Sequence, residues 1–142
     1  MLILLLCKRC NQYIGVYVNG IGCGIVVQPL IEYYDFGYIV VDGKSYSHDI
    51  IITPSHVVSD WWRLEGHRLQ IPDVRDYLEE DADVVVIGTG YNGMMYVDSD
   101  VIEEFRRHGK EVYVARTRIA VEIYNNLVKE GKKVVVFLHL TC

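Results

Sequence analysis

Residues 83–138 alternate continuous apolar runs with amphipathic segments, and this alternation limits the fold more than any other feature of the chain. The runs and the helical patterns between them lie at 84–87, 100–108, 112–115, 118–130 and 134–138. Strands that are apolar along their whole length are typical of parallel sheets covered by helices on both faces. The sequence therefore predicts an α/β fold in which flanking helices cover a mostly parallel central sheet.

Residues 31–53 predict an extra N-terminal β-hairpin in front of the alternating part. Extended segments at 31–36 and 38–41 lead to Asp42-Gly43-Lys44, a turn signal. The return strand, 45–53, alternates, with Ile50 and Ile52 facing one way. Its apolar end predicts a half-buried antiparallel strand, which Pro54 ends. We expect residues 31–142 to form a single α/β domain.

Residues 1–30 differ in composition from the rest, because they contain no acidic residue and three of the four cysteines. Two interpretations remain open: a β-hairpin that turns at Asn19-Gly20, or an N-terminal extension that does not fold with the domain. We favour the extension because Pro29 ends it just before the regular pattern begins. The redox states of the cysteines stay open, and no metal site is predicted. These cysteines are Cys7, Cys10, Cys23 and Cys142.

Composition argues against several functions. A net charge of −5 over 142 residues argues against nucleic acid as a partner, since nucleic-acid binding needs clustered Lys and Arg. No apolar run approaches the ~20 residues of a membrane span. Leu2 to Leu6 lacks a positive region before it, so a secretory signal is not expected. Four cysteines in such a chain favour a reducing compartment, and we expect a cytoplasmic protein.

Residues 88–93 match the pattern G-x-G-x-x-G after a strand, which raises the question of a dinucleotide site. The match is poor in context, because four residues, Met94 to Val97, separate Gly93 from the first credible helix cap. We expect instead a tight turn, a short strand or loop at 94–97, and a capping box at Asp100 and Glu103. No cofactor is predicted.

The turns after the first two buried strands are expected at the same edge of the sheet, where parallel sheets bind ligands. Gly88, Thr89 and Gly90 form one turn, and Arg116 and Thr117 form the other. Free N–H groups, a hydroxyl and a guanidinium together suit an anionic group. The alternative is an ordinary helix with Thr117 as its N-cap and solvated arginines.

Three polar residues beside two tryptophans are weak catalytic candidates: Arg63, Glu65 and His67. A histidine can transfer protons and a glutamate can orient it. No nucleophile at a familiar spacing accompanies them. The alternative is a structural loop held by ion pairs and an indole anchor.

Several short phrases in order resemble domain-of-unknown-function family 498 over residues 31–142. They are Tyr34-Asp35-Phe36-Gly37, Trp62-Arg63 with Gly66-His67, Gly88-Thr89-Gly90, Thr117 with Ala120-Val121 and Tyr124-Asn125, and Leu138-His139-Leu140-Thr141-Cys142. The resemblance implies a three-layer fold with a mixed sheet and an extra β-hairpin, and it brings no established reaction. Eukaryotic members of that family include a mitochondrial complex I assembly factor and an adipogenesis-associated protein, which favours an interaction role.

Two functional hypotheses follow. The first is a binding or assembly-type interaction protein, monomeric or weakly dimeric, with a protein partner and an anion or small-molecule site at the strand carboxyl ends. An exposed apolar patch bearing Tyr or Trp would favour it. The second is an enzyme or nucleotide binder that uses the Gly88-Thr89-Gly90 loop with Arg116 and Thr117. A closed pocket where those side chains converge would favour the second.

Overall fold

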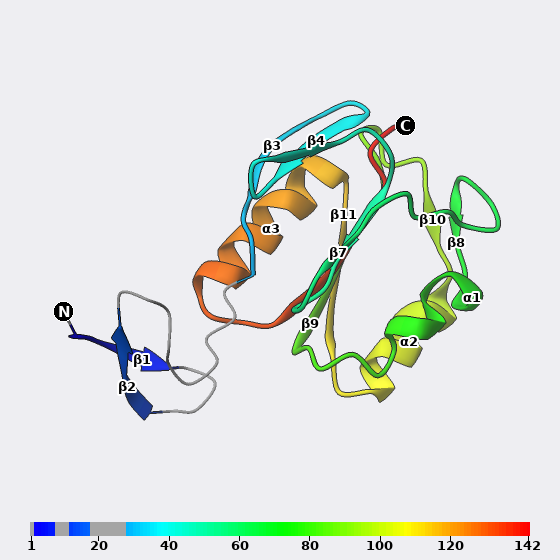
Figure 1. The fold of residues 1–142 in the computed structure, drawn as a ribbon. Coiled ribbons are helices and arrows are strands. Elements are labelled where there is room, and N and C mark those ends of the chain that lie inside the picture. Colours follow the sequence, from blue (N-terminus) through cyan, green and yellow to red (C-terminus); the bar gives the residue numbers. More distant parts are fainter. Residues whose placement is uncertain (1, 8–11, 18–27) are drawn as a thin grey trace.

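A five-stranded sheet forms the middle layer of the computed structural model, which describes residues 2–7, 12–17 and 28–142 (Figure 1). In sheet order, the strands are β11 (Glu111–Ala115), β9 (Val84–Gly88), β12 (Val134–Leu138), β6 (Ile50–Ile52) and β7 (Val57–Val58). β9 pairs in parallel with both β11 and β12, whereas β6 is antiparallel to β12 and β7 is antiparallel to β6. Four of the five strands therefore run in one direction, and the prediction of a mixed, mostly parallel sheet is confirmed.

A second sheet of three antiparallel strands precedes the main one in sequence. It consists of β3 (Ile31–Asp35), β4 (Tyr38–Val41) and β5 (Lys44–Tyr46). The predicted return strand at 45–53 is wrong in one respect, because it divides: β5 pairs with β4, and β6 crosses to the main sheet. Ile51 in β6 is as fully buried as its neighbours, since both faces of the main sheet are covered.

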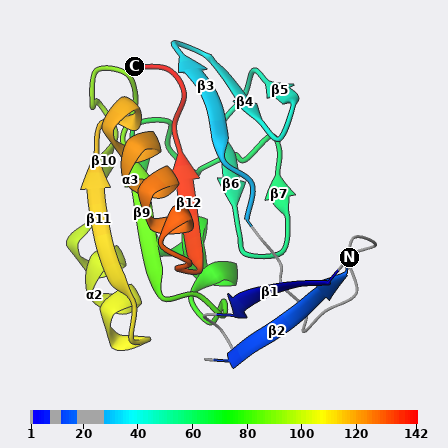
Figure 2. The same cartoon turned by 90° about the vertical axis from the view of Figure 1, so that its left-hand side faces the viewer.

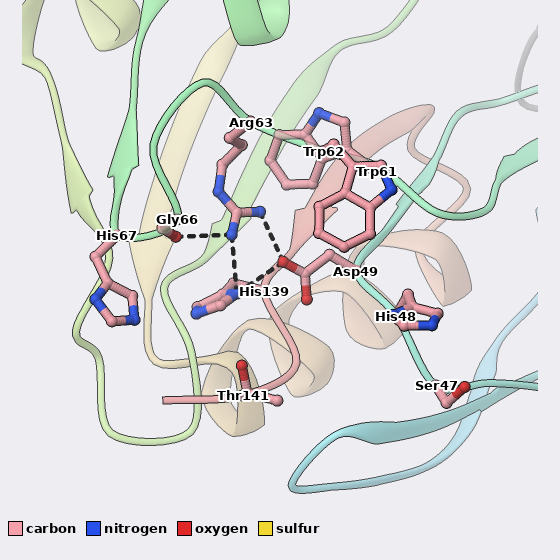
Figure 3. A pocket seen from close by; sticks show the side chains of 10 residues that line it. All are labelled: Ser47, His48, Asp49, Trp61, Trp62, Arg63, Gly66, His67, His139 and Thr141. Atoms are coloured by element: carbon pink, nitrogen blue, oxygen red, sulfur yellow. Dashed lines mark hydrogen bonds and ion pairs between the residues drawn. The ribbon is translucent and has the colours of Figure 1, made fainter.

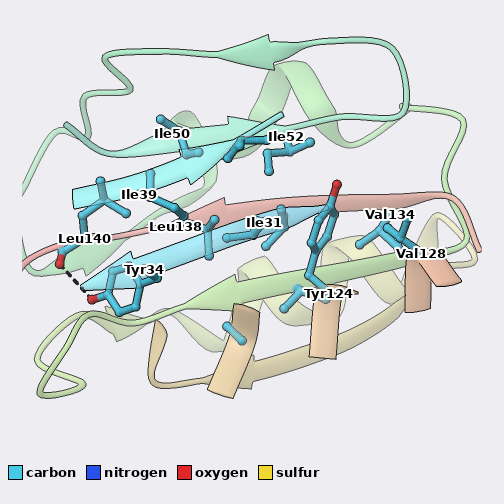
Figure 4. Packing of buried hydrophobic residues seen from close by; sticks show 14 of the residues in the cluster. Ile31, Tyr34, Ile39, Ile50, Ile52, Tyr124, Val128, Val134, Leu138 and Leu140 are labelled. Carbon is cyan, nitrogen blue, oxygen red and sulfur yellow. Dashed lines mark hydrogen bonds between the residues drawn. The ribbon is translucent and has the colours of Figure 1, made fainter. Parts of the chain in front are cut away.

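One face of the main sheet packs against α3 (Thr117–Lys129) and the β3–β4–β5 sheet (Figures 2 and 4). Tyr124 of α3 and Ile39 of β4 are both fully buried there, against strand residues such as Leu138. Burying a side chain of this size stabilises the fold by ~1.5–3 kcal/mol. Tyr34 joins the same cluster and donates a hydrogen bond to the Leu140 carbonyl at 2.8 Å.

The opposite face packs against α1 (Ile71–Val74), a 3₁₀ turn (Arg75–Tyr77) and α2 (Ser99–Arg107). Phe137 of β12 is the centre of this cluster. Its ring lies 5.4 Å from that of Trp61, 5.6 Å from Tyr77 and 5.9 Å from Phe105, measured between centroids. These two packed faces make the three layers that the family resemblance implies.

The helix starts differ from those predicted from the sequence. Asp98 and Arg116 occupy the N-cap positions of α2 and α3, so the Asp100 capping box and the Thr117 cap are wrong. Thr117 is fully buried in the first turn, where tertiary contacts use its hydroxyl. Gly109 and Gly131 have φ values of +75° and +82°, the left-handed conformation that ends a helix.

Two short pairs of strands complete the described structure. β8 (Arg68–Leu69) and β10 (Tyr96–Val97) pair in parallel, which confirms the short strand expected at 94–97. β1 (Leu2–Cys7) and β2 (Gln12–Tyr17) form an antiparallel pair, whereas the predicted turn at Asn19-Gly20 lies outside the described residues. Within the described ranges, no helix is long and apolar enough to span a membrane.

Candidate functional site

The ends of several strands meet at one edge of the main sheet, which we call the carboxyl rim (Figure 2, upper end). Gly88, the last residue of β9, is aligned with Ala115 of β11 and with Leu138 of β12. Because β6 runs the other way, Asp49 just before it lies at this same edge. The two turns considered from sequence therefore do share one rim, together with two further segments.

Thr117 connects the segments at this rim. Its hydroxyl accepts a hydrogen bond from the Gly90 N–H at 2.8 Å and donates one to the His139 carbonyl at 2.6 Å. Gly90 has a φ of +109°, and a Cβ there would lie 2.5 Å from the Thr141 carbonyl oxygen. Residues 139–142 therefore lie directly on the loop after β9, and only glycine permits this approach.

The loop after β9 has its backbone donors already engaged within the chain. Thr89 N–H donates to Ala115, Tyr91 N–H to Thr141, and Asn92 and Met94 N–H to Cys142. The N–H groups of Gly90, Gly93 and Met95 also have partners. An anion at Gly88-Thr89-Gly90 would have to displace these hydrogen bonds. The pocket next to this loop is therefore the better candidate site.

The surroundings of the glycine loop do not match those of a dinucleotide site. α2 begins at Ser99, far beyond Gly93, so no helix N-terminus meets the glycine loop as a dinucleotide site requires. Arg116 lies against Gly93, where a Cβ would come within 3.1 Å of the arginine Cγ. Thr117 does not present its hydroxyl to solvent, because it is fully buried.

The neighbouring pocket has a volume of about 440 Å³ and lies over the ends of β6 and β12 (Figure 3). Its walls combine histidines, two tryptophans, one ion pair and two hydroxyls. The lining residues are Ser47, His48, Asp49, Trp61, Trp62, Arg63, Gly66, His67, His139 and Thr141. We call it the His139 pocket.

Asp49 organises the base of the pocket. Its carboxylate accepts hydrogen bonds from Arg63 Nη1 at 2.7 Å, from His139 Nδ1 at 2.7 Å and from the Leu140 N–H at 2.8 Å. Burial alone would raise the pKa of this carboxyl, but the hydrogen bonds from His139, Leu140 and Arg63 together outweigh burial and lower it. Asp49 is therefore ionised at neutral pH.

The ionised carboxylate determines the tautomer of His139. A carboxylate only accepts hydrogen bonds, so the 2.7 Å contact places a hydrogen on Nδ1. The guanidinium of Arg63 only donates, so its Nη2, 3.1 Å from Nδ1, makes no hydrogen bond there and instead donates to the Gly66 carbonyl at 2.8 Å. The neutral ring thus carries its free lone pair on Nε2.

Two buried polar atoms in this pocket lack a hydrogen-bond partner among the described residues: His139 Nε2 and Arg63 Nε. Both side chains are well buried, at 6% and 4% exposure respectively. Unsatisfied buried polar atoms are uncommon in native proteins, and each calls for a bound water, an ion or a functional role. Figure 3 shows the Nε2 edge of His139 facing His67, whose ring centroid is 5.9 Å away.

The two tryptophans have different tasks. Trp61 is buried, packs on Phe137, and has the Arg63 guanidinium 4.8 Å from its ring centroid, which holds the arginine in place by a cation–π contact. Trp62 is 77% exposed, and its ring lies 5.9 Å from that of His48 at the pocket wall.

The structure brings together two of the three catalytic candidates predicted from sequence. Arg63 and His67 line the pocket, whereas Glu65 is 57% exposed and pairs with Arg68 at 3.2 Å. Asp49 and His139 were missed. The sequence does contain a signal for His139, because it directly follows the third buried strand, where parallel sheets place ligand-binding residues.

The layers, the parallel strand order and the site at the strand ends define a small three-layer α/β protein. The chain belongs to the family of proteins of unknown function DUF498/DUF598, whose sequence model matches residues 31–139. The resemblance noted from the sequence phrases is thereby confirmed.

Solved structures support the same assignment. A conserved hypothetical protein of Pyrococcus horikoshii OT3 is 30% identical, with a TM-score of 0.67, over 79% of this chain and 98% of that one. A Bordetella pertussis protein described as a Mth938-like domain is 21% identical, with a TM-score of 0.58, over 83% and 89%. A Bartonella henselae protein described as an outer membrane protein is 20% identical, with a TM-score of 0.70, over 82% and 98%. The last two likenesses concern the fold alone.

Proposed function

We propose that this protein is an assembly-type binding protein that holds a partner protein against the carboxyl rim. The observation that carries the proposal is a gathering of exposed apolar side chains there. In the described part of the chain, six of the eleven large apolar residues that are exposed come from three segments at the rim. We call these six the rim surface: Phe36, Trp62, Leu64, Tyr91, Met94 and Tyr96.

Hydrogen bonds hold the three segments of the rim surface beside the ends of β6 and β12. Gly37 N–H donates to Leu140, Trp61 N–H to Asp49, and Tyr91 N–H to Thr141. The rings of Phe36 and Tyr91 touch edge to face, with centroids 5.7 Å apart. A fixed scaffold under exposed aromatic residues is the usual arrangement of a protein-binding surface.

The exposures of the single residues are large. Trp62 is 77% exposed, Leu64 69%, Tyr96 66% and Met94 59%. Tryptophan and tyrosine are enriched among the residues that dominate binding energy, and truncating such an anchor costs ~2 kcal/mol or more. These exposed Tyr, Trp and other apolar residues support the proposal of an interaction protein.

The test compares partner capture by three forms of the chain: wild type, Leu64→Ser and Leu30→Ser. Leu30 is a matched control, because it is also an exposed leucine, at 38%, and precedes β3 outside the rim surface. A specific partner should bind wild type and Leu30→Ser, and should bind Leu64→Ser at least about tenfold more weakly. Equal binding to all three forms would contradict the proposal.

An acid–base enzyme is the second candidate, and the Asp49–His139 pair favours it. A carboxylate on Nδ1 with a free Nε2 is the arrangement of a histidine general base. The hydroxyls of Ser47 and Thr141 line the same pocket, but neither is hydrogen-bonded to Nε2. Turnover of a substrate that is lost in His139→Gln and retained in Leu64→Ser would favour this candidate over the first.

A further inference from the structure

We propose that the His139 pocket binds the carboxylate of a ligand at the Nε2 edge of His139, and that His139 takes up one proton when it does so. This site lies apart from the Gly88-Thr89-Gly90 loop and does not require the partner contact proposed above. The carboxylate belongs either to a free small acid or to the C-terminus of a protein, and the experiment below distinguishes the two sources.

The first step is the chemistry of the two atoms without partners. Arg63 Nε carries a hydrogen and has no acceptor among the described residues, and His139 Nε2 has neither donor nor acceptor there. The other guanidinium nitrogens are engaged, with Nη1 on Asp49 and Nη2 on Gly66. The site therefore offers one N–H from arginine, and a second N–H when His139 gains a proton on Nε2.

Two separate N–H donors suit a carboxylate better than a phosphate. A phosphate is typically held by several donors, often by an arginine that offers two parallel N–H groups. Here Arg63 Nη1 already donates to Asp49 and Nη2 to the Gly66 carbonyl, so no pair of parallel N–H groups is left for a phosphate. The donors left are single N–H groups, and a carboxylate, whose oxygens each accept from a single donor, suits them better than a phosphate does.

The second step is the charge in the pocket. The groups that face His139 are Asp49 from the start of β6, and Arg63 and His67 from the loop before β8, with His48 at the far wall. The charges of Asp49 and Arg63 cancel. A carboxylate that enters while the histidines are neutral would meet no net positive charge. We therefore expect uptake of one proton to accompany its binding.

The proton has a defined place. It comes from solvent and binds the Nε2 lone pair, so that the imidazolium donates through Nδ1 to Asp49 and through Nε2 to the ligand. The ring then lies between two carboxylates, one of the chain and one of the ligand, and both stabilise the cation. No covalent bond changes in this step other than the N–H bond that the proton forms.

The third step is access. Nε2 has almost no exposed surface, and Figure 3 places the His67 side chain on that side of the ring. His67 is itself exposed, and its backbone is held by the hydrogen bond that Tyr96 N–H donates to its carbonyl at 2.8 Å. A rotation of this one side chain, fast for an exposed residue, opens the space without moving the backbone.

The test is a titration of the ¹⁵N-labelled chain with sodium acetate, against sodium chloride at equal ionic strength, at about pH 6 and about pH 8. We expect acetate to shift the imidazole nitrogens of His139 and His67, with Nε2 of His139 changing from a lone pair to N–H. By linkage, the Kd should rise with pH by up to about tenfold per pH unit. Acetate that binds equally at both pH values would overturn the proton uptake.

Substitutions separate this site from the rim surface. His67→Ala uncovers Nε2, so it should bind acetate at least as tightly as wild type, whereas His108→Ala, just after α2, should leave binding unchanged. His139→Gln should abolish the response; if that variant does not fold, the pH dependence of acetate binding to wild type decides whether His139 takes up the proton. Leu64→Ser should still bind acetate, so failure of the rim surface and failure of this site give different results.

Further titrations distinguish a carboxylate from a phosphate and identify the source of the carboxylate. Inorganic phosphate that binds more tightly than acetate would overturn the assignment to carboxylates. A short peptide that ends in a free carboxylate, compared with its amidated form, reports the source. Tighter binding of the free form than of acetate, with the same His139 shift, supports a protein ligand, and tighter binding of succinate than of the peptide supports a free acid. No shift with acetate, succinate or the free peptide contradicts the proposal.

Discussion

Thr117→Val should destabilise this protein far more than its small chemical change suggests. The hydroxyl of Thr117 accepts the hydrogen bond of the Gly90 N–H, and it also donates to the His139 carbonyl. Valine has nearly the same shape, so the substitution leaves no cavity, and its cost comes from the two backbone groups that lose their partner. Each unsatisfied buried group costs ~1–3 kcal/mol, which gives ~2–6 kcal/mol in total.

The assay is urea unfolding of wild type, Thr117→Val and Thr117→Ser. Serine keeps the hydroxyl and loses one methyl group, so it should cost only ~1 kcal/mol. Since whole domains are stable by ~5–15 kcal/mol, the valine variant should unfold at much lower urea with a similar slope. A valine variant within ~0.5 kcal/mol of wild type, or more stable than the serine variant, would refute the bridging role of this hydroxyl.

Three further predictions concern the same end of the sheet. Gly90→Ala should lower the free energy of unfolding by ~3 kcal/mol or more, because a Cβ there would lie 2.5 Å from backbone atoms. Gly43 also has a positive φ but has open space around it, so Gly43→Ala should cost only ~1–2 kcal/mol. Equal losses in urea unfolding would show that residues 139–142 do not pack on the loop after β9. The pKa of Asp49 is lowered in the folded state, so its carboxylate stabilises the protein above the ordinary value of ~3.9 and this contribution fades as pH falls through the folded value. The difference in unfolding free energy between wild type and Asp49→Asn should therefore shrink below about pH 4, and a difference independent of pH would be the contrary result. Burial raises the pKa of Tyr34 to about 12, so the stability from its neutral hydroxyl is present below the ordinary pKa of ~10 and is lost as pH rises toward 12; absorbance titration of wild type against Tyr34→Phe should show one phenol ionising late, and its ionisation near pH ~10 would contradict the burial.

The layers and the strand order could be predicted because they depend on local patterns. The runs at 84–87, 112–115 and 134–138 are apolar without interruption, and such strands have few arrangements other than a covered parallel sheet. The glycines that end α2 and α3 also act locally, through a positive φ. For these elements the sequence is sufficient.

Asp49 could not be predicted as part of the site, because its position depends on a pairing between distant strands. The sequence pattern indicates one alternating strand at 45–53. In the structure, the pairing of β5 with β4 ends at Tyr46, and the chain continues as β6 beside β12. Only this crossing brings Asp49 next to His139, ninety residues along the chain. Local periodicity contains no information on which partner a strand chooses.

Thr117 shows how tertiary contacts can override the role that a residue's type and position suggest. Its type and position favour an N-cap, and a cap uses the hydroxyl within its own helix. In the structure the hydroxyl instead connects Gly90 to His139, because these two segments close over the start of α3. Arg116 takes the N-cap position without a capping side-chain bond.

The tautomer of His139 in the free protein is the most direct measurement of whether the pocket is built as described. The ¹⁵N chemical shifts and one-bond N–H couplings of the ring distinguish a protonated nitrogen from one with a lone pair. We predict hydrogen on Nδ1, bonded to Asp49, and a free lone pair on Nε2 at about pH 8. Hydrogen on Nε2 with a bare Nδ1 would contradict the Asp49–His139 bond and, with it, the site proposed for a carboxylate.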